Sequence, residues 1–313
     1  MANESQRLDL KKRIAHLEEE ISLARFSELK VGGHADFYTE ATTTIELVEA
    51  VTAALELQMP YLVIGKGHHI IFSDSGFPGL IISNQASTLA YDSERSQIVV
   101  DSGLVLASCV TQLASRGFGG LTPFFGEKGS IGSAVYRDLT VGGYPFTSLV
   151  RSINVLMPPT LIKPEATIAR FRSEWLRRDG AANRLKALRE ETELFTPQPV
   201  LLTLQLQLTS NRTDEIASRL TQQLAKYPAA RKNRLGPVFA PLPNQSVSAV
   251  LRGLQAERLR VGGVMVDKNY PNYLRAVGVV TAADVRKLIE ELAARAEEAG
   301  VKLKTRYEYE GVW

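Results

Sequence analysis

Three glycine-punctuated stretches of the sequence could approach an anionic ligand, and they lie at 31–33, 64–79 and 117–135. A lone glycine usually marks a turn, but a backbone without a Cβ also lets N–H groups approach a phosphate closely. The turn at 65–67 follows the apolar run YLVI, yet Ile70 stands where a dinucleotide fingerprint needs its third glycine. No stretch ends in Gly-Lys-Ser/Thr, so a Walker A loop is excluded as well. Two such loops on neighbouring domains can instead clamp a pyrophosphate.

Other reactive side chains give weaker signals. His68 and His69 are adjacent, and adjacent side chains on a strand point to opposite faces, so no metal site is expected. The single cysteine, Cys109, excludes an internal disulfide, and its apolar neighbours favour core packing over nucleophilic chemistry. Basic residues gather at 170–189, where they can bind an acidic protein partner or form a solvated helix face. Nucleic-acid binding is not favoured, because aromatic residues are not interleaved with these charges.

The composition is that of an ordinary globular protein. The chain has 313 residues, 37 basic and 34 acidic, with a net charge of only +3. This length corresponds to roughly two or three domains. No apolar run approaches the ~20 residues of a membrane span, and the charged N-terminus does not resemble a signal peptide. We therefore expect a cytoplasmic protein.

Hydrophobic periodicity predicts alternating strands and helices. Leu10, Ile14, Leu17 and Ile21 recur at helical spacing and predict one N-terminal amphipathic helix. Strands are expected at 35–41, 61–65, 69–72, 76–83, 96–103, 151–157, 200–208, 261–266, 272–277 and 303–310. Helices are expected at 45–57 (capped by Thr44), 104–116, 209–227, 247–254 and 281–300 (capped by Thr281 and ended by Gly300).

The ordered set of glycine stretches resembles the UDP-N-acetylenolpyruvoylglucosamine reductase family, flavoenzymes that make UDP-N-acetylmuramate. FSELKVGGHA is similar to the family's NTTFKIGGPA, and GKGHHIIFSDSGFPGLII is similar to GGGSNLLVSDxGFxGLVI. GGLTPFFGEKGSIGSAVYRD is similar to GLExLSGIPGSIGGAVYMN, and GPVFAPLP stands where GSVFKNP is expected. GLQAERLRVGGVMVDKNYPNYL is similar to GLKGxxIGGAQVSEKHANFI. The resemblance runs from about Phe26 to Gly311, and the length is closer to the family's shorter subtype.

The resemblance implies an α+β, three-domain flavoenzyme fold, with two FAD-type domains of the vanillyl-alcohol-oxidase/PCMH kind and a C-terminal substrate-type domain. We expect an N-terminal helix at 1–25, FAD-type subdomains at 26–84 and 85–208, and the substrate-type domain at 209–313. It also implies FAD as cofactor, NADPH as the hydride donor and a UDP-sugar as substrate. The implied cofactor-binding residues are Gly65, Lys66, Gly67, His68, His69, Gly129, Ser130, Ile131, Gly132 and Ala134.

The family's catalytic residues are replaced in this sequence. Pro237 stands where the family has its proton-donating serine, and Arg306 stands where it has its glutamate. Ala240 replaces the lysine of the same motif, whereas Arg172 corresponds to the arginine expected from a GYRxS motif. The resemblance thus suggests a catalytically impaired homologue that retains FAD or UDP-sugar binding. The alternatives are an active reductase whose acid is Glu308 or Ser246, and a non-enzymatic interaction scaffold.

Overall fold

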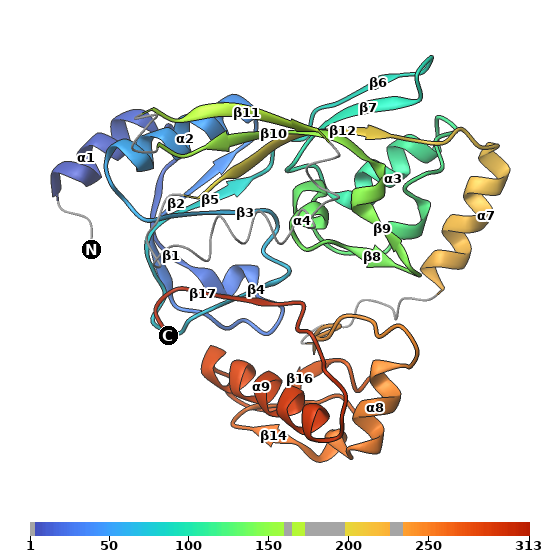
Figure 1. Cartoon of the computed structure of the whole chain (residues 1–313). Coiled ribbons are helices and arrows are strands. Elements are labelled where there is room, and N and C mark those ends of the chain that lie inside the picture. The colour runs from blue at the N-terminus through green and yellow to red at the C-terminus, as the bar shows by residue number, and fades with distance from the viewer. Residues whose placement is uncertain (1–3, 160–164, 173–197, 226–233) are drawn as a thin grey trace. The chain divides into compact units, whose positions relative to one another are not determined.

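A computed structural model describes residues 4–159, 165–172, 198–225 and 234–313 of the chain (Figure 1). These residues form two compact units. The first comprises the described residues within 1–18, 37–66 and 79–228, and the second those within 19–36, 67–78 and 229–313. Each unit contains both helices and strands, as the predicted α+β class requires. The finer division into four segments stays a prediction.

The N-terminal segment differs from the single helix predicted for it. Helix α1 (Glu4–Arg13) ends where the Ile14 N–H donates to the Leu10 carbonyl at 2.9 Å. Strand β1 (Glu18–Ser22) follows, so the helix prediction is wrong over these residues. β1 pairs at the edge of a sheet with the order β1-β2-β5-β3, and its exposure alternates with period two. Strand pairing outweighs the helical spacing of Leu17 and Ile21, because tertiary context overrides a short local pattern.

Three strands of that sheet run into the first unit. They are β2 (His34–Ala41), β5 (Phe77–Asn84) and β3 (Tyr61–Ile64). β3 and β5 are parallel, and α2 (Thr44–Glu56) connects β2 to β3 and buries its apolar face in a core shared with Leu10 and Ile14. The helix cap is Thr43 rather than the expected Thr44, because the Thr43 Oγ accepts from the Glu46 N–H at 3.1 Å.

A five-stranded antiparallel sheet forms the rest of the first unit, in the order β11-β10-β12-β7-β6. Its strands are β6 (Leu89–Asp92), β7 (Gln97–Asp101), β10 (Val150–Met157), β11 (Thr167–Arg172) and β12 (Val200–Gln207). Helices α3 (Leu106–Ala114) and α4 (Ile131–Tyr136) cover one face of it (Figure 1), and their apolar residues share a core with Leu204 and Leu206. The hairpin β8 (Thr140–Val141) and β9 (Tyr144–Pro145) follows α4.

Helix α7 (Thr213–Leu224) also belongs to the first unit, and it begins four residues later than predicted. Ser210 forms a β-bridge with Phe118, and the Asn211 N–H donates to the Gly117 carbonyl at 2.9 Å. These contacts hold 209–211 in an extended conformation.

The second unit contains a small sheet with the order β13-β16-β15-β14, packed with helices α8 and α9. Its elements are β13 (Arg234–Leu235), α8 (Val247–Gly253), β14 (Arg260–Val261), β15 (Val264–Val266), β16 (Leu274–Ala276) and α9 (Ala282–Glu298). Strand β17 (Glu308–Glu310) pairs in parallel with β4 (Ile70–Phe72). The predicted strand at 303–310 is therefore correct only in its last residues.

Cys109 lies within the core of the first unit, as expected, with no exposed surface. Burial raises the pKa of its thiol to about 12, because the thiolate would lose its hydration. We predict that the native protein does not react with a thiol reagent at mildly alkaline pH. One equivalent should react after unfolding in denaturant. Stoichiometric reaction of the native chain would contradict this placement.

The N-terminus of α9 is capped by Thr281, as predicted. Its Oγ accepts from the Asp284 N–H at 3.0 Å, and Asp284 accepts in return from the Thr281 N–H. Thr281→Ala should lower the free energy of unfolding by about 1 kcal/mol, measured by chemical denaturation. Ser246 occupies the cap of α8 without a side-chain hydrogen bond, so Ser246→Ala is the matched control and should change little. Equal effects of the two substitutions would contradict the role of the cap.

Candidate functional site

Two of the glycine stretches approach each other in the first unit. Gly65 follows β3, and Ser130 precedes α4. A Cβ placed on Gly65 would lie only 3.0 Å from the Ser130 Oγ, which is closer than ordinary van der Waals contact. The two loops that were expected to flank a pyrophosphate thus lie close together, and a side chain at 65 would require the Ser130 side chain to shift.

The loop before α4 is held in a capping box. The Ser130 Oγ accepts from the Ser133 N–H at 3.2 Å, and the Ser133 Oγ accepts from the Ser130 N–H at 2.9 Å. Gly129 has φ +113°, and a Cβ there would lie 2.4 Å from the Ser133 Oγ. A Cβ on Gly132 would lie 2.9 Å from the Ser102 Cβ. The glycines of this loop are therefore required by the packing of the turn itself.

Two residues that follow this loop pack in the hydrophobic core of the first unit. Ile131 and Ala134 are fully buried among the apolar side chains of α3, β7 and β12. The N–H of Ile131 donates to the Leu104 carbonyl at 2.9 Å, and the N–H of Gly132 donates to the Ser102 carbonyl at 2.7 Å. These two N–H groups are thus already hydrogen-bonded within the protein.

The turn after β3 offers donors toward an anion. Among the described residues, no hydrogen bond is made by the backbone N–H groups of Lys66 and Gly67. The Lys66 ammonium donates to the Gln85 Oε1 at 3.0 Å, which holds a positive charge beside the turn. Gly67 has φ +73°, and a Cβ there would lie 2.7 Å from the Phe26 Cβ. N–H groups without a backbone hydrogen-bond partner in the described part of the chain, a nearby cation and glycines without a Cβ fit a pyrophosphate group.

A buried hydrogen-bond chain anchors the first unit beneath these loops, and the sequence analysis did not identify it. The Asn84 Nδ2 donates to the Ser102 Oγ at 2.8 Å, and the Ser102 Oγ donates to the Leu201 carbonyl at 2.6 Å. A Cβ on Gly103 would lie 2.4 Å from the Asn84 Oδ1. The Ser-Gly pair directly after the strand 97–101 was the available signal.

His69 lies in the second unit beside the chain end. Its carbonyl accepts from the Glu308 N–H at 3.0 Å, and its ring centroid lies 5.9 Å from that of Tyr307. Both His68 and His69 are half-buried. Among the described residues, no cluster of three His, Cys, Asp or Glu side chains is arranged to hold a metal ion.

The positions of the two replaced catalytic residues are brought together in the second unit. Next to Pro237, the Val238 carbonyl accepts from the Arg306 N–H at 2.8 Å. The Ala240 N–H donates to the Lys304 carbonyl at 2.9 Å, and Phe239 and Thr305 form a β-bridge between these two contacts. Backbone pairing therefore fixes the distance between the two segments, whatever side chains they present.

The remaining candidates lie apart from this pairing. Glu308 begins β17, opposite Ile70 of β4, and is half-buried. Ser246 is exposed at the start of α8. Arg172 is the exposed last residue of β11 in the first unit. Of the basic stretch at 170–189, residues from 173 onward lie outside the described residues.

Comparisons with known proteins agree with the expected fold. Residues 35–158 match the model of the FAD binding domain family. The solved structure of UDP-N-acetylenolpyruvylglucosamine reductase from Thermus caldophilus superposes with a TM-score of 0.71 at 22% identity, covering 94% of this chain and 99% of that one. This confirms the α+β flavoenzyme fold. Within the part of the chain that the structure describes, no helix has the length and apolar character needed to cross a membrane.

Two curated relatives with the same name align with this chain along nearly their whole length. UDP-N-acetylenolpyruvoylglucosamine reductase of Chlamydia muridarum is 26% identical over 288 residues, which cover 92% of both proteins. The enzyme of Chlamydia pneumoniae is 24% identical over 284 residues, covering 90% of this chain and 88% of that protein. With the ordered motifs and the matching fold, these relatives show that the chain is similar to UDP-N-acetylenolpyruvoylglucosamine reductases along nearly its whole length, at low sequence identity.

Proposed function

We propose that this protein binds FAD with its glycine loops and takes a UDP-sugar ligand, but that its reductase step is impaired. The single observation that carries the proposal is the backbone pairing of 238–240 with 304–306. It brings Pro237 and Arg306 to the two neighbouring segments where the family resemblance implies a serine and a glutamate. The fold and the loops are those of a flavoprotein, whereas the proton-donating groups are missing.

The turn at Gly65 and Lys66 and the loop at 129–132, both in the first unit, fit a dinucleotide pyrophosphate. The N–H group of Lys66, which makes no backbone hydrogen bond among the described residues, and the Lys66 ammonium supply hydrogen bonds and positive charge. The approach of Gly65 to Ser130 keeps both backbones close to the same anion. FAD, when bound, supplies the hydride chemistry, and the protein supplies position and charge.

The chain's own residues cannot perform the expected proton transfer at Pro237. A proline has no hydroxyl and no backbone N–H, so it offers no proton to a substrate carbanion. Arg306 brings a permanent positive charge to the position of a carboxylate, and a guanidinium is not deprotonated in proteins, so it does not serve as an acid. A missing general acid typically costs about 10²- to 10⁴-fold in rate.

We predict that the purified protein shows a bound-flavin absorption spectrum, at least after FAD is added. With NADPH and UDP-N-acetylglucosamine enolpyruvate it should form product about 10²- to 10⁴-fold more slowly than the ~10 s⁻¹ of an ordinary enzyme. Gly65→Val should weaken FAD binding, because its side chain meets Ser130. Gly253→Ala is the control, because nothing lies within 4 Å of its Cβ position. Turnover at an ordinary rate would refute the impairment, and a failure to bind FAD would refute the cofactor assignment.

A second candidate is an active NADPH-dependent reductase in which Glu308 acts as the acid. It is favoured by the hydrogen bond from the Glu308 N–H to the carbonyl of His69, at the end of the cofactor loop. Glu308 lies two residues beyond Arg306, and even spacing on a strand keeps side chains on one face. Ser246 is a weaker alternative, because it is exposed at the cap of α8.

If the wild-type protein turns over, Glu308→Gln should abolish product formation while leaving the flavin spectrum unchanged. The amide keeps the size of the side chain and removes the transferable proton. Glu298→Gln at the exposed end of α9 is the matched control and should behave as the wild type. Full activity of Glu308→Gln would exclude this second candidate.

A further inference from the structure

Three arginines line one hollow in the first unit, away from the glycine loops. The hollow has a volume of about 260 Å³, and its lining residues are Arg151, Ser152, Arg170, Arg172 and Gln205. They come from the three neighbouring strands β10, β11 and β12 of the five-stranded sheet. Nothing in the sequence analysis grouped Arg151 with the other two arginines.

A β-bulge explains how the three arginines come to one place. Ser152 lies directly opposite Arg172 on β11 and opposite Gln205 on β12, so these three side chains share one face of the sheet. The register of β10 against β12 shifts between Val150 and Ser152. The extra residue at this shift is Arg151, and a bulge turns such a side chain away from strict alternation. Arg151 therefore joins the hollow instead of pointing into the core.

The hollow lies on the opposite face of the sheet from α4. Side chains alternate along a strand, and Ile153 and Leu204, the neighbours of Ser152 and Gln205, are buried in the core with Ile131. Ser152 and Gln205 thus face away from the loop that precedes α4. A ligand in this hollow is separated from that loop by the thickness of the sheet.

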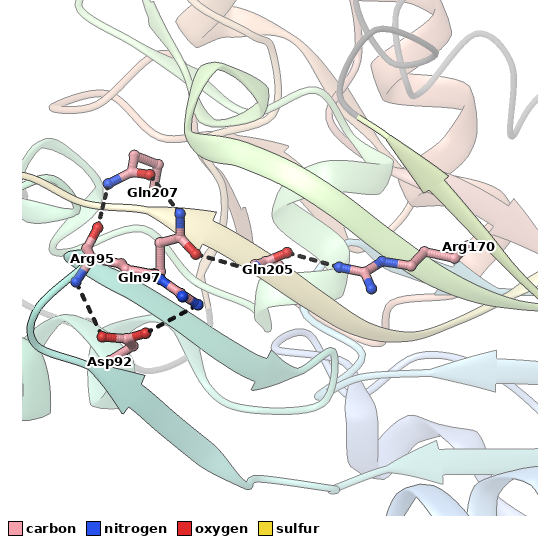
Figure 2. A network of polar contacts seen from close by, with 6 residues as sticks. All are labelled: Asp92, Arg95, Gln97, Arg170, Gln205 and Gln207. Atoms are coloured by element: carbon pink, nitrogen blue, oxygen red, sulfur yellow. Dashed lines mark hydrogen bonds and ion pairs between the residues drawn. The ribbon is translucent and has the colours of Figure 1, made fainter.

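Arg170 is held in place by a ladder of polar side chains (Figure 2). Its Nε and Nη2 donate to the Ser152 Oγ at 3.2 and 3.1 Å, and its Nη2 donates to the Gln205 Oε1 at 2.9 Å. Gln205 in turn donates to Gln97 at 3.0 Å, and Gln97 donates to Gln207 at 3.0 Å. The ladder fixes the orientation of one guanidinium before any ligand arrives.

The side-chain groups in the hollow that remain available to a ligand are hydrogen-bond donors. The Ser152 hydroxyl donates to the Gln205 Oε1 at 3.1 Å, and both oxygens also accept from Arg170. Within the described residues, Arg151, Arg170 and Arg172 form no ion pair with a carboxylate. Among the described residues, three guanidinium groups with no acidic partner therefore line a cavity whose two side-chain acceptors, the Ser152 Oγ and the Gln205 Oε1, already accept hydrogen bonds. Guanidinium forks match the oxygens of phosphate groups in geometry and charge.

We propose that this hollow is a binding site for a small molecule that bears a phosphate or diphosphate group. The site includes Arg172, for which the family resemblance implied a catalytic role, and the proposal assigns this arginine instead to a separate phosphate site that does not depend on the FAD and UDP-sugar binding proposed above. The three positive charges of the hollow match a ligand with two or three negative charges. The volume of the hollow is large enough for a ligand bigger than a single ion. The pinned Arg170 reduces the ordering cost of binding.

The test is calorimetric titration of the full chain with inorganic pyrophosphate, in the presence of saturating FAD so that the glycine loops are blocked. We expect binding of one pyrophosphate. Arg151→Ala should weaken it by roughly tenfold or more, because a charge-assisted hydrogen-bond pair is lost. Arg170→Lys keeps the charge but loses the fork, and should weaken binding, with the melting temperature measured to show that the variant remains folded. Arg219→Ala, on the exposed face of α7, is the matched control and should bind as the wild type.

The proposal is overturned if Arg151→Ala, Arg170→Lys and Arg219→Ala bind pyrophosphate equally. It is also overturned if FAD abolishes pyrophosphate binding, because the binding then belongs to the glycine loops. If the chain fails to bind FAD, the titration is run without it, and the arginine variants alone decide. Binding of a polyglutamate peptide without binding of pyrophosphate or a sugar phosphate would make the surface a polypeptide contact, which contradicts the proposal.

Discussion

The close approach of Gly65 to Ser130 is the contact on which the proposed cofactor site depends. It places the end of β3 beside the start of α4, and a side chain at 65 would displace the Ser130 hydroxyl. The buried hydrogen bonds from Asn84 to Ser102, and from Ser102 to Leu201, tie the ends of β5 and β7 to β12, and the Gly132 N–H of α4 donates to the Ser102 carbonyl. Unpaired buried polar groups are costly, so this chain of bonds holds the loops in one arrangement. The loop side chains can change, as at His68 and His69, without moving the backbone that would face a pyrophosphate.

In the second unit, too, the backbone structure does not depend on the side chains that the family uses for catalysis. The segment at 238–240 is attached to 304–306 by main-chain hydrogen bonds, and Asn272 adds bonds to Val238 and Phe239. None of these contacts requires the family's serine or glutamate. Replacement by Pro237 and Arg306 is therefore compatible with an intact unit. The two replacements remove the groups that a proton transfer needs and leave the main-chain hydrogen bonds around them in place.

Local patterns in the sequence predicted most elements but not the contacts between distant ones. The alternation over 200–208 predicted β12, because every second residue from Val200 to Leu206 is buried. Thr281 predicted the start of α9, because a cap is satisfied by residues close in the chain, here by the Asp284 N–H. The spacing of Leu17 and Ile21 instead suggested a helix where β1 pairs with another strand. The contact of Gly65 with Ser130 and the bulge at Arg151 depend on tertiary packing and strand register, which no local pattern determines. The family motifs, not the periodicity, indicated which glycines to consider.

The most direct test of this account follows the oxidative half of the reaction. The FAD-loaded protein is reduced chemically without oxygen, mixed with UDP-N-acetylglucosamine enolpyruvate, and monitored by flavin absorbance. The account predicts that flavin is bound and that its reoxidation by this substrate is slower by orders of magnitude than ordinary turnover, because Pro237 and Arg306 provide no acid. Rapid reoxidation of the flavin on mixing would contradict it.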